Sequence, residues 1–457
     1  MKIFNSLSGK KEELKTLQNG KLGIYVCGMT VYDDCHIGHA RTFLSFDMIV
    51  RYLRYKNIKV NYIRNITDVD DKILKRAEEH KEEPIILSSR YIERMTSDFN
   101  ALGMITPDKE PKATGNIQII IDLIQILLDS GNAYHEGGDV YFSVDSFSNY
   151  GRLSNQKMDE ILTGVRIKVD EDKKNSADFV LWKKSNESLN WDSPWGPGRP
   201  GWHIECSAMS MDSLGEHFDI HAGGSDLKFP HHENEIAQSE AATGKKFANY
   251  WMHTGPLRID KEKMSKSLDN FITIRDALKA HSPEILRYFL LSSHYRSPIN
   301  YSESGLKESK AALDRLYNSI NGLDFNAEDR SLHSSYSKKF LRAMDDDFNV
   351  PEALAVLFDL SKAINKNKED GNDDKASLLA AQLVSLSEPL GLLQQDPQSF
   401  LRSGVNMDES EINKLIKERE EARERNDYAK ADKIRDSLYK KNVILEDSKE
   451  ETFWRKK

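Results

Sequence analysis

Two histidines three residues apart are the first side chains in this sequence that could do chemistry. His36 and His39 follow an apolar run, residues 22–27, that predicts a buried strand. They precede residues 41–55, whose apolar positions recur with a helical period. A strand-to-helix turn suits phosphate binding, because free backbone N–H groups and the positive end of the helix dipole point outward there. Gly38 has no Cβ, so a flat base could approach the backbone. The alternative is a pair of histidines that only caps the helix.

Side chains that bind soft or borderline metals recur in distant segments. They stand at the end of the first strand, at the start of a later helix and together on a further predicted helix: Cys27, Cys206, His231 and Glu235. Two thiolates, an imidazole and a carboxylate suit zinc. His232 and Cys35 are rival ligands by residue type alone. The alternative is a set of buried free cysteines beside solvated polar residues at a helix N-terminus.

A glycine turn and a lysine-rich loop follow in the second half of the chain's sheet pattern. Gly223 and the glycine after it permit close backbone approach, and Asp226 could accept hydrogen bonds from ribose hydroxyls. Lys263 and Lys266 lie in a loop, residues 258–268. From there they could reach a polyphosphate and offset the charge that builds on a leaving pyrophosphate. Exposed basic loops are common, so the alternative is a solvated surface loop.

The segments that must position these side chains alternate between strands and helices. The strands are predicted at 59–66, 218–222 and 250–255, and the helices at 69–79, 202–209 and 229–242. This alternation predicts a parallel sheet with crossover helices, and ligand groups gather at the carboxyl ends of such strands. A polar cluster follows the second strand: Thr67, Asp68, Asp70 and Asp71. Helix capping is the alternative role for that cluster.

Length and composition limit the class of protein. The 457 residues, 39% of them hydrophobic, predict two to four domains with ample core. The N-terminus lacks the apolar run of a signal peptide, and no stretch reaches the roughly 20 apolar residues that span a bilayer. Three cysteines cannot build a disulfide framework, which favours a cytoplasmic location. A net charge of −8 argues against bulk nucleic-acid coating but permits a local basic groove.

The pattern changes at residue 84 and returns to the sheet pattern near residue 191. Residues 84–190 contain predicted helices at 85–100 and 116–131, predicted strands at 137–144 and 177–183, and a charged loop at 168–175. They indicate an inserted α+β subdomain. The Pro- and Gly-rich residues 191–201 predict a loop.

The last third of the chain is predominantly helical. Helical spacing predicts helices at 282–292, 304–321, 337–344, 351–366 and 374–390. Residues 411–457 carry 14 Lys and Arg against 12 Asp and Glu, and their helical part, 411–439, could equally be a solvated surface. The predicted domains are 1–83 with 191–281 as the two halves of a catalytic domain, 84–190 as the insertion, 282–393 as a helical bundle region, 394–410 as a linker and 411–457 as a small C-terminal domain.

Taken in order, these segments resemble the two signatures of class I aminoacyl-tRNA synthetases. His36-Ile37-Gly38-His39 is similar to the first signature and Lys263-Met264-Ser265-Lys266-Ser267 to the second. Four longer motifs resemble cysteinyl-tRNA synthetases in particular: CGMTVY at 27–32, NITDVDDK at 65–72, GWHIECS at 201–207 and FPHHENE at 229–235. The resemblance covers residues 3–457 and implies a Rossmann-like parallel-sheet catalytic domain, the inserted α+β subdomain, a helical bundle and a small C-terminal domain.

The resemblance also implies an activity and a set of site residues. The activity is ATP-dependent conversion of L-cysteine to cysteinyl-adenylate and transfer to the 3′ end of tRNA(Cys), with magnesium accompanying ATP. The implied catalytic residues are His36, His39, Lys263 and Lys266, and the implied zinc ligands are Cys27, Cys206, His231 and Glu235. ATP would be bound by Gly38, Gly223, Asp226 and Lys266, and the amino-acid pocket would be lined by Thr67 and Trp202. Cys35 has no implied role.

Zinc provides a physical reason for specificity. Cysteine and serine are nearly isosteric, and a pocket that recognises shape alone discriminates between such amino acids by roughly 10² or less. A thiolate is a soft ligand that binds zinc directly, whereas a serine hydroxyl offers no comparable bond. We therefore expect discrimination without a separate editing domain.

The resemblance makes residues 411–457 an anticodon-binding domain, in which Arg419, Arg423 and Trp454 are the expected RNA contacts. The expected protein is a monomer with no membrane contact. Two other classes stay open: a ligase that joins activated cysteine to a small amine, and a non-catalytic zinc- and RNA-binding relative. The presence of residues 411–457 argues against the first, and the intact signature histidines and lysines argue against the second.

Overall fold

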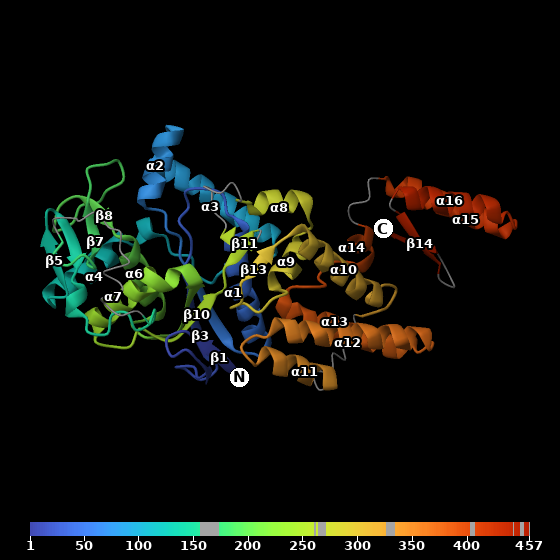
Figure 1. The fold of residues 1–457 in the computed structure, drawn as a ribbon, viewed down its shortest axis with the longest axis horizontal. Helices are drawn as coiled ribbons and strands as arrows, with labels where there is room; N and C mark the ends of the chain where they lie inside the picture. The colour runs from blue at the N-terminus through green and yellow to red at the C-terminus, as the bar shows by residue number, and fades with distance from the viewer. Residues whose placement is uncertain are drawn as a thin grey trace. The chain divides into compact units, whose positions relative to one another are not determined.

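Figure 1 shows the chain in a computed structural model, coloured from the blue N-terminus to the red C-terminus. The structure describes residues 1–155, 173–259, 262–263, 271–325, 334–402, 407–441, 443–447 and 452–456. The chain forms two compact units, 1–309 with 339–354, and 310–338 with 355–457. Within the described residues, no helix is long and apolar enough to cross a membrane.

The first unit is built on a four-stranded parallel sheet in the order β10-β9-β3-β4. Its strands are β3 (Lys21–Val26), β4 (Lys59–Arg64), β9 (Phe218–Gly224) and β10 (Ala248–Thr254). The predicted parallel sheet is confirmed. From β3 the chain moves outward to β4, and it later returns on the other side of β3 as β9 and β10. The point where the strand order reverses therefore lies between β3 and β9, and the crevice at their carboxyl ends is where such sheets bind ligands.

Helices connect and cover these strands. They are α1 (Ile37–Tyr55), α2 (Asp71–His80), α6 (Trp202–Leu214) and α7 (Glu233–Thr243). Helix α1 is apolar and buried on nearly all sides, with Phe43 and Phe46 among its buried residues, as expected of a helix enclosed by other elements. The helix predicted at 229–242 starts later than expected. Ser225–Leu227 form a 3₁₀ turn, and Lys228–His232 form a π-helical turn in which Phe229 has non-helical angles, so the α-helix begins at Glu233.

The predicted insertion forms a second, antiparallel sheet in the order β5-β6-β7-β8. Its elements are α3 (Pro84–Ala101), η1 (Ala113–Asn116), α4 (Ile117–Asp129), β5 (Ala133–Glu136), β6 (Asp139–Phe142), η2 (Val144–Ser146), β7 (Phe179–Lys184) and β8 (Gly198–Pro200). Helix α4 packs against α6 and α7, which lie between the insertion's strands and β3 in Figure 1. Strands β5 and β8 were not predicted, and β8 replaces part of the loop expected at 191–201. The loop expected at 168–175 lies mostly outside the described residues.

The rest of the first unit is a short hairpin and the segments that follow β10. These elements are β1 (Lys2–Asn5), β2 (Lys10–Glu13), β11 (Leu257–Ile259), β12 (Glu262–Lys263), β13 (Ile299–Tyr301), α8 (Ile274–Ala280) and α9 (Pro283–Leu291). Residues 345–347 pair with the N-terminal strand, where the Asp347 carboxylate accepts hydrogen bonds from Phe4 N and the Tyr295 hydroxyl, each at 2.8 Å.

Helices α10 (Glu303–Ile320), α11 (Ser335–Met344) and α12 (Val350–Glu369) each have residues in both units. The second unit continues with α13 (Asp373–Ser387), η6 (Glu388–Leu390), α14 (Pro397–Arg402), α15 (Glu409–Glu424), α16 (Tyr428–Lys440), β14 (Val443–Asp447) and β15 (Thr452–Lys456). The expected linker thus contains a helix, α14. The charged stretch is two helices, because Asn426 has a left-handed backbone and Asp427 caps a new helix. A closing antiparallel hairpin, which was not predicted, covers their apolar side.

Candidate active site

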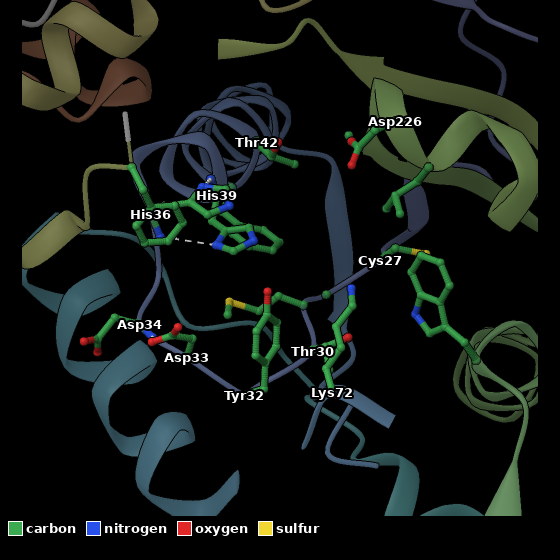
Figure 2. A pocket seen from close by; sticks show the side chains of 17 residues that line it. Cys27, Thr30, Tyr32, Asp33, Asp34, His36, His39, Thr42, Lys72 and Asp226 are labelled. Carbon is green, nitrogen blue, oxygen red and sulfur yellow. Dashed lines mark hydrogen bonds between the residues drawn. The ribbon is translucent and has the colours of Figure 1, made fainter. Parts of the chain in front are cut away.

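A cavity of about 550 Å³ opens at the carboxyl ends of β3 and β9. Figure 2 shows the side chains around it: Cys27, Thr30, Tyr32, Asp33, Asp34, His36, His39, Thr42, Lys72 and Asp226 carry labels. Trp202, Gly224 and Phe271 also line it. Segments from the loop after β3, from α1, from α2, from the start of α6 and from the turn after β9 therefore meet in one place.

His36 and His39 form a reciprocal capping box at the N-terminus of helix α1. His39 N donates to His36 Nδ1 at 3.2 Å, and His36 N donates to His39 Nδ1 at 3.3 Å. Because backbone N–H groups are donors, both Nδ1 atoms are acceptors, and each neutral ring carries its proton on Nε2. Burial lowers the pKa of His36 to about 4, and burial together with His36 lowers the pKa of His39 well below its usual range. The pair is thus neutral at pH 7 and offers two Nε2–H donors.

The segment that follows the second signature is hydrogen-bonded to the first. Ile274 N donates to Cys35 O at 2.8 Å, and Ile37 N donates to Ile272 O at 3.1 Å. Phe271 meets the His36 ring edge-on, with centroids 5.2 Å apart. Lys263 lies on β12, of which only the backbone is described, and Lys266 lies outside the described residues.

The four predicted metal ligands come together in one buried cluster. Their ligand atoms all lie within 4.8 Å of one another: Cys27 Sγ, Cys206 Sγ, a His231 ring nitrogen and a Glu235 oxygen. Cys27 Sγ lies 3.4 Å from Glu235 Oε1 and 3.7 Å from His231 Nε2. His231 Nε2 lies 3.0 Å from the same Glu235 oxygen. Cys27 also lines the cavity, so the cluster borders it.

A second combination of side chains satisfies the same distance limit. It keeps Cys27 and Glu235 and replaces the other two ligands with His221 and His232. One ring nitrogen of each histidine has a partner, since His221 Nε2 lies 2.8 Å from Glu235 Oε2 and His232 Nδ1 lies 2.8 Å from His253 Nε2. The other nitrogens, His221 Nδ1 and His232 Nε2, are buried without a hydrogen-bond partner among the described residues. His221 was not predicted as a site residue. Cys35 belongs to neither set, and its thiol contacts Met29 Sδ at 3.2 Å.

Burial and mutual contacts shift the pKa values of the side chains in the cluster, and they raise the pKa of Cys27 well above its usual range. Hydrogen bonding to Cys27 lowers the pKa of Cys206 to about 6, with His231 adding to the effect. Burial by itself lowers the pKa of His231, but the adjacent Glu235 and Cys206 raise it to about 10. His203 Nδ1 lies 2.9 Å from His231 Nδ1, which leaves Nε2 facing the thiols. Two thiols, a carboxylate and an oriented imidazole around one point fit a zinc ion.

The structure separates the two residues predicted for the amino-acid pocket. Trp202 lines the cavity, is 38% exposed and stacks on His231 with ring centroids 4.4 Å apart. Thr67 is buried and absent from the cavity wall. Its backbone forms a parallel bridge with Thr30, and its hydroxyl accepts a hydrogen bond from Asn65 Nδ2 at 3.3 Å. Thr67 therefore supports the loop at 29–31 through its backbone and does not line the cavity.

Two of the predicted nucleotide-binding glycines are also away from the cavity wall. Gly38 lies in the first turn of α1, and Gly223 packs against the His232 ring, where an added Cβ would come within 3.0 Å. Gly224 lines the cavity beside Asp226. The backbone at Gly223 is thus approached closely by the His232 ring and not by a ligand. The glycine that faces the cavity is Gly224.

Comparison with known proteins identifies the family. Residues 13–311 match the model of the tRNA synthetases class I (C) catalytic domain, 339–394 match the DALR domain, and 409–455 match the cysteinyl-tRNA ligase anticodon binding domain. The chain is 55% identical to the cysteine–tRNA ligase of Hahella chejuensis and 56% identical to that of Shewanella sediminis, over the whole of each chain. The chain belongs to the cysteinyl-tRNA synthetase family of class I.

This synthetase is accordingly an ATP-dependent ligase that joins cysteine to tRNA, and the small-amine and non-catalytic alternatives are not favoured. A methionyl-tRNA synthetase of Mycobacterium tuberculosis in complex with methionyl-adenylate shares the fold. The TM-score is 0.59 and the identity 14%, over 83% of this chain and 91% of that one.

Several residues of the synthetase's cavity were not predicted from the sequence. They are Thr30, Tyr32, Asp33, Asp34, Thr42 and Lys72. Lys72 ends the motif at 65–72, and its place directly after the polar cluster was the available signal. The acidic members of that cluster have structural roles. Asp68 accepts from Thr114 N at 2.9 Å, Asp70 caps α2, and Asp71 pairs with Lys183 at 3.1 Å and with Arg199.

The structure places two of the three predicted RNA contacts in the interior of the C-terminal domain. Arg419 forms two hydrogen bonds of 2.8 Å with the Asp447 carboxylate, and its side chain is 6% exposed. Trp454 is buried in the apolar cluster, and its indole N–H donates to Asn413 at 3.2 Å. Arg423 is half-exposed and pairs with Asp447 at 3.2 Å. Among the described residues of α16, Tyr428 and Tyr439 are large and exposed.

Proposed function

We propose that this synthetase selects cysteine at a zinc ion held by Cys27, Cys206, His231 and Glu235. The observation that carries the proposal is the convergence of these four donors in one buried cluster that borders the cavity. The combination with His221 and His232 is less suitable, because it offers one thiol instead of two and its His221 is already bonded to Glu235 through Nε2. Trp202 lines the cavity and stacks on His231, which supports the His231 set as the one next to the substrate.

When bound, the zinc supplies a soft Lewis acid that binds the substrate thiolate and has little affinity for a serine hydroxyl. The surrounding residues prepare the ligands. His203 occupies Nδ1 of His231, and His221 holds the second oxygen of Glu235. Outer contacts of this kind fix ring orientation and carboxylate position.

We propose that ATP, accompanied by magnesium, lies along the other wall of the cavity. His36 and His39 offer Nε2–H donors beside the N-terminus of α1, which suits the phosphates. Asp226 lines the cavity beside Gly224 and is positioned to accept hydrogen bonds from the ribose. Lys263 and Lys266 would stabilise the leaving pyrophosphate.

We propose that the anticodon of tRNA(Cys) binds the domain at 409–455, with Arg423 and the exposed Tyr428 as the contacts best placed for RNA. The cavity and the metal cluster are each formed within one chain, which supports a monomer. The free thiols of Cys27, Cys35 and Cys206 suit the reducing cytoplasm.

A thiol substitution tests the zinc proposal. Cys206→Ser should fold and bind ATP, yet lose most of its affinity for cysteine and most of its preference over serine. Cys35→Ser is the matched control, because Cys35 is equally buried but outside the cluster. In cobalt-substituted protein, cysteine should produce a new sulfur-to-metal charge-transfer band and serine should not. An unchanged spectrum with cysteine that is still activated would refute the proposal.

A further inference from the structure

Lys72 is the only lysine or arginine among the described residues that line the cavity. The same wall carries three carboxylates, Asp33, Asp34 and Asp226. The substrates of the reaction, ATP and the carboxylate of an amino acid, are both anionic. A cavity that accepts them needs a positive group at the point where their charges meet, and Lys72 is the described candidate.

Two of the three carboxylates are already paired with arginine side chains that do not line the cavity. Asp33 pairs with Arg76 at 2.6 Å, and Asp34 forms two hydrogen bonds with Arg94, at 2.5 and 2.6 Å. Lys72 has no ion-pair partner in the part of the chain that the structure describes, and its side chain is exposed. Its charge is therefore available to a ligand.

The position of Lys72 is fixed by its helix. Asp70 caps α2 by accepting from Lys72 N at 2.7 Å, and the Lys72 ammonium lies 5.6 Å from the centre of the Tyr32 ring. Figure 2 shows the Lys72 side chain rising beside Thr30 and Tyr32 into the space between Cys27 and the histidine pair. It thus points to the middle of the cavity, away from either end.

The middle of the cavity is where the amino-acid carboxylate must lie. With the thiol of cysteine at the Cys27 cluster, the carboxylate carbon is three bonds away, roughly 3–4 Å from the sulfur. The phosphates approach from the side of His36 and His39. We propose that Lys72 binds the α-carboxylate of substrate cysteine, an assignment that rests on the proposed placement of the thiol.

The chemistry defines which oxygen Lys72 holds. In the activation step, one carboxylate oxygen forms a bond to the α-phosphorus of ATP while the bond to pyrophosphate breaks, and pyrophosphate leaves with that electron pair. Lys72 contacts the other oxygen, which becomes the carbonyl oxygen of the adenylate and loses charge as the bond forms. The interaction is therefore stronger in the ground state, so Lys72 contributes to cysteine binding more than to the rate of the chemical step.

Pyrophosphate exchange with four proteins tests this role: wild type, Lys72→Met, Lys72→Arg and the control Lys75→Met. Lys75 is exposed one turn further along α2 and does not line the cavity. Lys72→Met should raise the KM for cysteine about tenfold, as expected for loss of a charged hydrogen bond, with kcat and the KM for ATP nearly unchanged. Lys72→Arg should restore most of the affinity, and Lys75→Met should match wild type.

L-Cysteinol, which keeps the thiol and amine but lacks the carboxylate, supplies the decisive comparison. Its inhibition constant should be the same for wild type and Lys72→Met. An equal loss of affinity for cysteine and cysteinol would overturn the assignment. So would normal exchange combined with impaired transfer to tRNA, which would place Lys72 on the RNA. Cobalt-substituted Lys72→Met provides the control for the metal site. A sulfur-to-metal charge-transfer band on addition of cysteinol would show that the site still binds the thiol. Failure of the Lys72 assignment can therefore be distinguished from failure of the zinc proposal.

Discussion

His221 Nε2 lies 2.8 Å from Glu235 Oε2, and both side chains are completely buried. This contact holds one oxygen of the proposed metal-binding carboxylate, while the other faces Cys27 and His231. We predict that His221→Phe folds but binds zinc about 10–100-fold less tightly, because outer-sphere partners of metal ligands have effects of that size. Competition with a chelator measures the change, and His135→Phe, at an exposed position of β5, is the control. Zinc affinity equal to that of wild type would contradict the prediction.

A buried ion pair joins helix α1 to helix α9. Arg287 donates to the Asp47 carboxylate, which also accepts from Ile105 N at 2.7 Å, and both charged side chains are nearly inaccessible. Asp47→Asn should lower the free energy of unfolding by about 3–5 kcal/mol, because it leaves a buried guanidinium uncompensated. Asp346→Asn, which removes the exposed partner of Lys11, should cost about 0–1 kcal/mol. Urea-induced unfolding compares the two, and equal losses would show that burial of the first pair is unimportant.

The two signature histidines, which are partly buried, predict a loss of stability in mild acid. Burial lowers the pKa of His36 from 6.5 to about 4. As pH falls below 6.5 the unfolded chain takes up a proton and the folded chain does not, so stability present above pH 6.5 is lost as pH falls toward 4. Between pH 7.5 and 5.0, the wild type should lose about 1–2 kcal/mol more than His36→Asn, which can still cap α1. Parallel pH profiles of the two proteins would exclude this source of acid sensitivity.

Lys266 lies outside the described residues, so its role is tested by kinetics. Lys266→Ala should lower the rate of adenylate formation about 10²-fold while cysteine affinity changes little, because the phosphate gains charge only in the transition state. Pyrophosphate exchange gives the first quantity, and equilibrium titration with cysteine gives the second. Equal losses in both would mean that the second signature binds the ground state.

Removal of residues 411–457 separates the two steps of the reaction. These residues form a cluster of their own around Ile412, Leu438 and Trp454, so the cavity should survive their loss. Exchange activity should stay near that of wild type, while kcat/KM for tRNA falls roughly tenfold or more, as expected when base-stacking contacts are lost. Tyr428→Ala in the full chain should reproduce part of that loss. If the shortened chain still aminoacylates tRNA at the full rate, this segment does not bind the anticodon.

The parallel sheet was predictable because its strands are short segments rich in apolar residues that alternate along the chain with longer segments able to form helices. Strand β8 was not predictable, because Gly198–Pro200 lie in a Pro- and Gly-rich segment that locally favours a turn. Only pairing with β7, where Lys183 faces Arg199, makes it a strand. The start of α7 was misplaced for a related reason, because the apolar pattern continues through Phe229 although its backbone leaves the helix.

At the site, residue types predicted the convergence of the four donors, but not their surroundings. His221 lies in the middle of β9, where its neighbours indicate a core position. Thr67 follows β4 along the chain as expected, yet its bridge to Thr30 holds it against the loop at 29–31 and away from the cavity wall. In α15, a sequence charged on nearly every face does not indicate that Arg419 is the side chain that packs inward.

The reciprocal caps of His36 and His39 have a genetic consequence. Each imidazole keeps its Nε2 proton because the other residue's backbone N–H occupies its Nδ1. A substitution at either position therefore removes that ring's Nε2–H donor, but it leaves the backbone N–H that fixes the tautomer of the other ring. The two rings also stack with their centroids 3.6 Å apart, so the effects of the two mutations should not be simply additive. The spacing of three residues is equally constrained, since one inserted residue would break both caps, so mutational tolerance at the two positions should rise or fall together.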